Sequence, residues 1–211
     1  MLALLLLLQA QVPLPDTLVV RAAAYPPAAG ERPDSAELGS PQVRLGTAQG
    51  DVLGWLIHAR DSVYLAVLVP DSTPGPGDAV AVSLNIGGER SAHPDHADFQ
   101  WIFQRTLDSS VVYRGKSGRW QPPRDDPDWR LGAARTGAGW AVTSAEGPRW
   151  WSVVLRLDPA WLDGVAGSLP AIAFRVTDGH PRAWYSWPSP PAGRRALDVE
   201  GTPSLWVPVR R

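Results

Sequence analysis

Apolar and polar residues alternate over short segments along most of the chain, which is the pattern of half-buried β-strands. In AVAVSLNI (79–86) the larger apolar side chains fall on every second position, so they share one face of an extended strand. FQWIF (99–103) places its three aromatic residues on one face in the same way. The same pattern appears in LGWLIHA (53–59), SVYLAVLV (62–69), WSVVLRL (151–157) and AIAFRV (171–176). We expect each segment to form a strand, and we expect TLVVRAAAY (17–25) to form an edge strand.

Turn-forming residues separate these segments. Arg60-Asp61 predicts a tight hairpin, and DSTPGPGD, IGGERSAHPD and DDPD supply the Gly, Pro and Asp that turns require. One short helix is expected near 159–163, because Asp158 can cap it, Pro159 suits its first turn and Gly164 follows its end. Many short strands with almost no helix predict an all-β, antiparallel β-sandwich with immunoglobulin-like or jelly-roll-like layers. A closed barrel is the structural alternative.

The length and the N-terminus predict how the chain is divided. Its 211 residues are enough for one domain with a substantial core, and with no cysteine that core must be stable without disulfides. The apolar run at 2–8, followed by Gln9-Ala10-Gln11, is typical of a secretory signal and too short to span a bilayer. We therefore expect a signal peptide at 1–10, an N-terminal extension at 11–42, a sandwich domain at 43–211, and a secreted, periplasmic or extracellular protein.

Charge and motifs exclude several classes of function. The net charge of −1 gives no field that would attract nucleic acid, and no transmembrane segment is expected. GKS (115–117) lacks the glycine and the strand–helix context of a phosphate loop, and GAG (137–139) breaks the dinucleotide pattern. No G-x-S-x-G or H-E-x-x-H motif is present. The sequence therefore predicts a protein that is not an enzyme.

One polar cluster, HPDHAD, contains His93, Asp95, His96 and Asp98. Imidazole and carboxylate groups are ligands of Zn²⁺, and the carboxylate oxygens alone can hold Ca²⁺. The alternative is a solvated turn between two strands. A Ca or Zn site here is a hypothesis, and no cofactor is otherwise indicated.

Several segments together resemble the family 9 carbohydrate-binding modules and their DOMON-like relatives. SVYLAVLVPDSTPGPGDAVAVSLN (62–85) is similar to paired strands of that family, and RWWSVVLRLDPAWL (149–162) to a later strand that runs into a short helix. AIAFRVTD (171–178), Trp187-Pro188 and PSLW (203–206) follow in the family's order. Asn85 stands where the family's third strand tends to end in Asp. The resemblance covers roughly residues 43–208 and implies a sandwich that binds sugar without cleaving it.

The aromatic residues of this chain fit that expectation. Tryptophan occurs 11 times, and AWYSWPSPP (183–191) holds three aromatic residues within four positions. A sugar ring has apolar C–H faces and hydroxyl edges, so it favours a flat ring beneath it and polar groups around it. The predicted rings are Trp184, Tyr185 and Trp187, with Trp120 or Trp129 as a second platform. The predicted polar groups are Asp178, His180 and Arg182.

Trp184 and Trp187 point to opposite faces if the strand is regular. We therefore expect one to anchor the core and the other to border a ligand. Pro188 favours a chain that leaves the sheet at Trp187, which predicts that Trp187 is the exposed ring and Trp184 the packed one.

Two other functions compete with sugar binding. DOMON-like relatives include haem-binding electron-transfer domains, whose iron needs axial Met, His or Lys ligands. Lys116 is the only lysine and Met1 the only methionine, so two histidines would have to serve. The other alternative is an interaction module in the cell envelope, with a protein partner for its aromatic residues.

Overall fold

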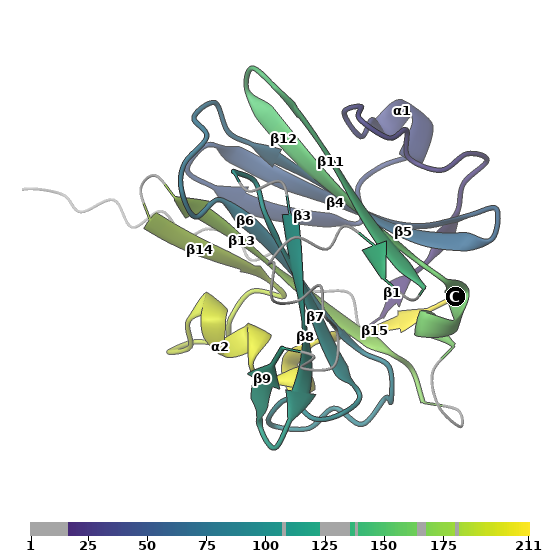
Figure 1. Cartoon of the computed structure of the whole chain (residues 1–211), viewed down its shortest axis with the longest axis vertical. Helices are drawn as coiled ribbons and strands as arrows, with labels where there is room; N and C mark the ends of the chain where they lie inside the picture. The colour runs from purple at the N-terminus through teal and green to yellow at the C-terminus, as the bar shows by residue number, and fades with distance from the viewer. Residues whose placement is uncertain (1–16, 107–108, 123–135, 138, 164–167, 180–181) are drawn as a thin grey trace, which may run out of the picture.

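Two β-sheets lie face to face as a sandwich (Figure 1). The computed structural model describes residues 17–106, 109–122, 136–137, 139–163, 168–179 and 182–211. Within these residues the only parallel strand pairs involve the N-terminal segment, and every other pair is antiparallel. The predicted all-β sandwich is confirmed.

The strands of each sheet follow a continuous order. The eight-stranded sheet runs β1 (Leu18–Val19), β15 (Val207–Arg210), β13 (Ala171–Gly179), β6 (Ala79–Asn85), β7 (Asp98–Gln104), β8 (Ser109–Lys116) and β9 (Arg119–Gln121), with β14 (Arg182–Trp187) also paired to β13. The seven-stranded sheet runs β10 (Thr136–Gly137), β11 (Trp140–Gly147), β12 (Trp150–Leu157), β5 (Ser62–Pro70), β4 (Gly50–Ala59) and β2 (Arg21–Ala22), with β3 (Val43–Thr47) also paired to β4. Arg60-Asp61 forms the predicted hairpin, since Ala59 pairs with Ser62.

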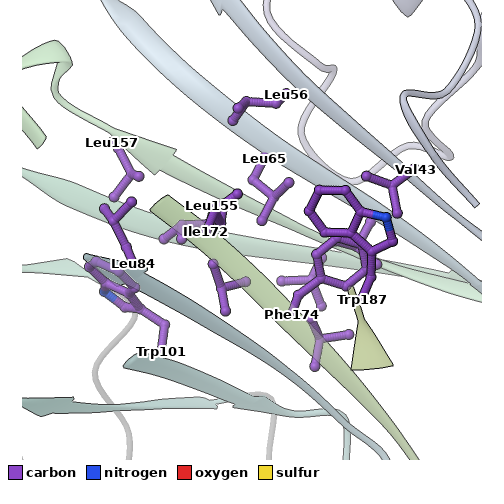
Figure 2. Packing of buried hydrophobic residues seen from close by; sticks show 14 of the residues in the cluster. Val43, Leu56, Leu65, Leu84, Trp101, Leu155, Leu157, Ile172, Phe174 and Trp187 are labelled. Atoms are coloured by element: carbon purple, nitrogen blue, oxygen red, sulfur yellow. The ribbon is translucent and has the colours of Figure 1, made fainter. Parts of the chain in front are cut away.

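The inward faces of both sheets form one apolar core. Leu84, Trp101 and Ile172 come from the eight-stranded sheet and meet Leu65 and Leu155 from the other (Figure 2). These positions are the large apolar members of the period-2 segments, so the alternation correctly identified the core face. Burying such side chains is the main force that holds the two layers together.

The expected edge strand at 17–25 forms two short strands, one in each sheet. β1 pairs with β15, and β2 pairs with β4. The amide side chain of Gln42 holds this segment against the sandwich: Nε2 donates to the carbonyls of Val19 (2.7 Å) and Leu56 (3.1 Å), and Oε1 accepts from the Leu56 amide (2.7 Å). One side chain thus supplies hydrogen bonds that a strand backbone would make.

The helices in the described part of the chain are short. The helix expected near 159–163 is a single 3₁₀ turn, η2 (Pro159–Leu162), in which Asp158 is the N-cap residue without a capping side-chain hydrogen bond. α1 (Ser35–Leu38), α2 (Ala196–Glu200) and the 3₁₀ turn η3 (Pro203–Leu205) were not expected. α2 lies outside β13 and β14 (Figure 1), where Trp206 Nε1 donates to the Val199 carbonyl at 2.8 Å. Among the described residues, no helix has the length and apolar character needed to cross a membrane.

Candidate functional site

Trp187 belongs to the core, so its expected exposure was wrong. Its side chain is 4% exposed and stacks on Phe174, with ring centroids 5.4 Å apart (Figure 2). The strand does not leave the sheet before this residue, because β14 includes Trp187 and pairs it with Phe174. Pro188 follows the last paired position and does not displace the indole.

Trp184 has the opposite environment and is 41% exposed, so its expected packing was also wrong. Three positions separate it from Trp187 in a regular strand, which turns the two rings to opposite faces of the sheet. Trp184 is therefore the ring of this pair that a ligand can reach. Whether Trp184 can bind a ligand depends on the side chains that lie beside it.

The strand register sets those surroundings. Trp184 pairs with Thr177 on β13, Thr177 with Ala79 on β6, and Ala79 with Gln104 on β7. Directly paired residues point to the same face, so these four side chains form a row across the outer face of the sheet. Small side chains lie beside the indole and an amide lies beyond them, so the row combines a flat ring with a hydrogen-bonding group.

Tyr185 and Asp178 lie at the same end of the sandwich. Tyr185 is half-buried against the core, and its hydroxyl oxygen is 3.5 Å from the Ala48 amide nitrogen, which donates to it. Asp178 accepts a hydrogen bond from Gln49 Nε2 at 3.0 Å. The predicted ligand residues Asp178, Trp184 and Tyr185 are thus neighbours, although Trp184 and Tyr185 point to opposite faces.

None of the other predicted ligand residues is placed beside Asp178, Trp184 and Tyr185 by the described part of the structure. Trp120 is in β9 beside Gly115, at the opposite end of the sheet, and its ring is parallel to that of Trp206 at 6.2 Å. Arg182 begins β14, but its side chain is outside the described part. His180 and Trp129 also lie outside the described residues.

HPDHAD runs into β7, of which Asp98 is the first residue, at the end of the sandwich opposite Trp184. His93 and His96 are exposed, whereas Asp98 is fully buried. The Asp98 carboxylate accepts from Asn85 Nδ2 and from the Asp95 amide, both at 2.7 Å. Burial raises the pKa of Asp98 to about 6, although both hydrogen bonds lower it. This carboxylate therefore fixes the loop to the end of β6.

The described residues contain no group of three or more His, Asp or Glu side chains that could hold a metal ion. Of the four predicted ligands, Asp98 already accepts two hydrogen bonds within the protein. The Ca or Zn site remains a hypothesis. The metal ligands would have to be other side chains of this loop.

A buried charged cluster that the sequence analysis missed lies near Asp178. Arg105 Nη1 is 2.7 Å from Asp71 and 3.4 Å from Asp78, and Nε donates to Glu146 at 3.1 Å. The Arg105 side chain is only 6% exposed, and its guanidinium lies 5.5 Å from the centre of the Trp151 ring. Burial raises the pKa of Asp71, and the charge of Asp78 raises it further.

The sequence alone did not indicate that the residues of this charged cluster would meet. Asp71 and Asp78 bound the DSTPGPGD turn, where aspartate is ordinary, and Arg105 follows a strand. Asp78 also accepts from the amides of Gly75 and Gly179, both at 2.8 Å, so it joins this turn to the end of β13. The cluster depends on the ends of several strands meeting, which only the topology reveals.

Comparisons with known proteins agree with the fold. No family model and no curated protein matches the chain. Among solved structures, a family 9 carbohydrate-binding module from Caldicellulosiruptor kristjanssonii in complex with cellotriose has a TM-score of 0.60 and 16% sequence identity, covering 92% of each chain. A family 9 module from the same organism in complex with glucose has a TM-score of 0.55 and 15% identity, covering 91% of this chain and 94% of the other. The chain therefore has a fold like that of the family 9 carbohydrate-binding modules.

Proposed function

We propose that this chain is an exported, non-catalytic carbohydrate-binding module that holds a sugar ring against Trp184. The observation that carries the proposal is the exposure of this indole on a fold whose neighbours are described in complex with cellotriose and glucose. An exposed indole offers a flat apolar surface, and such surfaces suit the C–H face of a sugar. The apolar run at 2–8 supports export.

The row of paired residues beside Trp184 ends in a side chain that can form hydrogen bonds with a sugar. Ala79 and Thr177 are small and almost completely buried, and Thr177 accepts a hydrogen bond from the neighbouring Arg175 guanidinium. Gln104, three strands away, is half-buried and carries both a donor and an acceptor. Strands are spaced about 4.8 Å apart, so Trp184 and Gln104 lie about 14 Å apart across the sheet. We expect the ligand to stack on Trp184, with Gln104 as a more distant hydrogen-bonding group.

The test is isothermal titration with glucose and cellotriose on the wild-type protein and the Trp184→Ala variant. Loss of the stacking surface should weaken binding about tenfold, which corresponds to about 1.4 kcal/mol. Tyr25→Ala is the matched control, since this ring is 75% exposed and lies outside the row, and its affinity should equal that of the wild type. Equal affinity of the Trp184→Ala variant would contradict the proposal, as would binding of no sugar on a glycan array.

Trp187→Ala provides the opposite control. Removing this buried ring should cost about 3–5 kcal/mol of unfolding free energy, because it leaves a cavity beside Phe174. At a temperature where both variants are folded, Trp187→Ala should still bind sugar. The pair of variants thus separates a ligand-facing ring from a core ring within one strand.

One observation favours the second candidate, an interaction module. Leu197 on α2 is 39% exposed, and α2 contacts β14, which carries the exposed Trp184. Exposed apolar side chains on adjoining elements are typical of protein-binding surfaces. Leu197→Ser should leave sugar affinity unchanged but reduce capture of a protein partner from an envelope extract. A visible absorption spectrum tests the remaining alternative, haem binding.

A further inference from the structure

A cavity of about 460 Å³ opens between the ends of the two sheets. Phe103 and Arg105 border it from the eight-stranded sheet, and Glu146 and Trp151 border it from the β11–β12 hairpin. The rings of Phe103 and Trp151 lie 6.3 Å apart across the two layers. This volume is in the range of small-molecule sites, and the cavity lies on the inward side of the sheet, whereas Trp184 points outward.

The walls of the cavity are fixed before any ligand enters. Arg105 is held through Nε and Nη1 by the carboxylates of Asp71, Asp78 and Glu146. These contacts use Nε and Nη1, and Arg105 lines the cavity with its guanidinium held over the Trp151 ring. Glu146 is 63% exposed and accepts from Arg105 through Oε2, and a carboxylate has two oxygens that can accept. The cavity therefore presents a fixed donor next to a charged acceptor.

The charge of this cluster restricts the ligand. Three carboxylates surround one guanidinium, so an anionic ligand meets excess negative charge in a partly desolvated place. A neutral hydroxylated ring meets no such penalty. Each hydroxyl can accept from Arg105 and donate to Glu146, and the apolar C–H groups can contact Phe103, Trp151 and Pro74.

We infer that this cavity is a second carbohydrate site, which takes one neutral sugar ring in preference to an acidic one. The inference shares its ligand class with the proposed function but depends on different residues. Glu146 donates no proton in this role: it accepts a hydroxyl hydrogen bond and repels a ligand carboxylate. Its charge thus decides between neutral and acidic sugars.

The Glu146→Gln variant tests whether the negative charge of Glu146 sets the preference for neutral sugars. The glutamine can still accept from Arg105 but loses the negative charge, so affinity for glucose should fall while affinity for glucuronate should rise. We expect the wild-type protein to prefer glucose about tenfold and the variant to bind both sugars within about threefold. Glu37→Gln, an exposed change on α1, should leave the preference unchanged.

Amide chemical shifts locate each sugar during these titrations. Glucose should shift the amides of Thr106, Ala145 and Glu146, and these shifts should persist in the Trp184→Ala variant. Shifts confined to the row of Trp184 would overturn the cavity site and leave the proposed function intact. Shifts confined to the cavity would support this site and contradict the role of Trp184. Equal glucuronate affinity in the wild-type protein and Glu146→Gln would also overturn the inference.

Discussion

Asp98 is a buried carboxyl group whose ionisation is costly in the folded protein. Burial raises its pKa from the ordinary 3.8 to about 6, so between these values the folded state binds more protons than the unfolded state. Stability from this residue therefore falls as the pH rises from about 4 to about 6. The two hydrogen bonds from Asn85 and the Asp95 amide offset part of this cost.

We expect the Asp98→Asn variant to lack this pH dependence. The unfolding free energy of the wild-type protein minus that of the variant should fall by about 1–3 kcal/mol between pH 4 and pH 7. Urea denaturation at several pH values measures this difference, with the exposed Asp61→Asn change as a control. A difference that is constant with pH would show that Asp98 titrates near its ordinary pKa.

Trp184 and Trp187 show what the sequence could predict about single residues. The period of two correctly predicted that the rings face opposite ways, because side chains alternate in every regular strand. Which ring is buried depends on which face of β14 meets the second sheet, and that follows from pairing with β13. The proline after Trp187 was weaker evidence than the pairing of Trp187 with Phe174.

At the scale of elements, the N-terminal segment is joined to the sandwich through Gln42. Its side chain bonds to the backbone of Val19 and Leu56, and the Leu56 amide donates back to it. The segment's own strands are only two residues long, so the Gln42 bond to Val19 adds to their few backbone pairs and to the burial of Leu18 and Val20. Sequence patterns predicted an edge strand here but could not identify a glutamine as its partner.

Gln42→Ala should loosen this segment while leaving the rest of the sandwich folded. Losing a half-buried amide and leaving its partners unsatisfied should cost about 1–3 kcal/mol of unfolding free energy. Hydrogen exchange should show faster exchange at the amides of Val20 and Ala23, which donate to the Arg210 and His58 carbonyls. Gln49→Ala, which removes an exposed side-chain contact to Asp178, should not change exchange at these amides.

Three further elements could not be predicted from the alternation of apolar and polar residues. α1, α2 and η3 have three to five residues each, too few to display a helical period. β6 is buried on both faces, so its alternation of larger and smaller residues predicted the strand but not the cover over its outer side. Trp206 and Val199 provide such cover over the neighbouring β13.

At the scale of the whole molecule, Arg105 joins the two sheets at one end. It follows β7 of the eight-stranded sheet, and its partners are Asp71, which follows β5, and Glu146 in β11 of the other sheet. Such a cross-link between strands distant in sequence could not be predicted from periodicity. Asp71 and Asp78 are 6% and 1% exposed, and both pair with Arg105 in the part of the chain that the structure describes.

Arg105→Met keeps the length of the side chain but leaves these carboxylates without their cation. We expect a loss of about 3–5 kcal/mol of unfolding free energy at neutral pH, with a smaller loss at acidic pH, where the carboxyl groups become protonated. Chemical denaturation measures both. Arg44→Met is the control, because its pair with Asp51 is exposed and should contribute less than about 1 kcal/mol. Equal losses in the two variants would contradict this account.

β1 and β15 form a parallel pair near the two ends of the chain, with Leu18 opposite Val209. During synthesis the first strand leaves the ribosome long before its partner exists, so it must wait unpaired while the other strands assemble. Closing so large a loop makes this contact a late and slow event in folding. The sandwich can thus be completed only after β15 has been synthesised, and until then β1 lacks its partner strand.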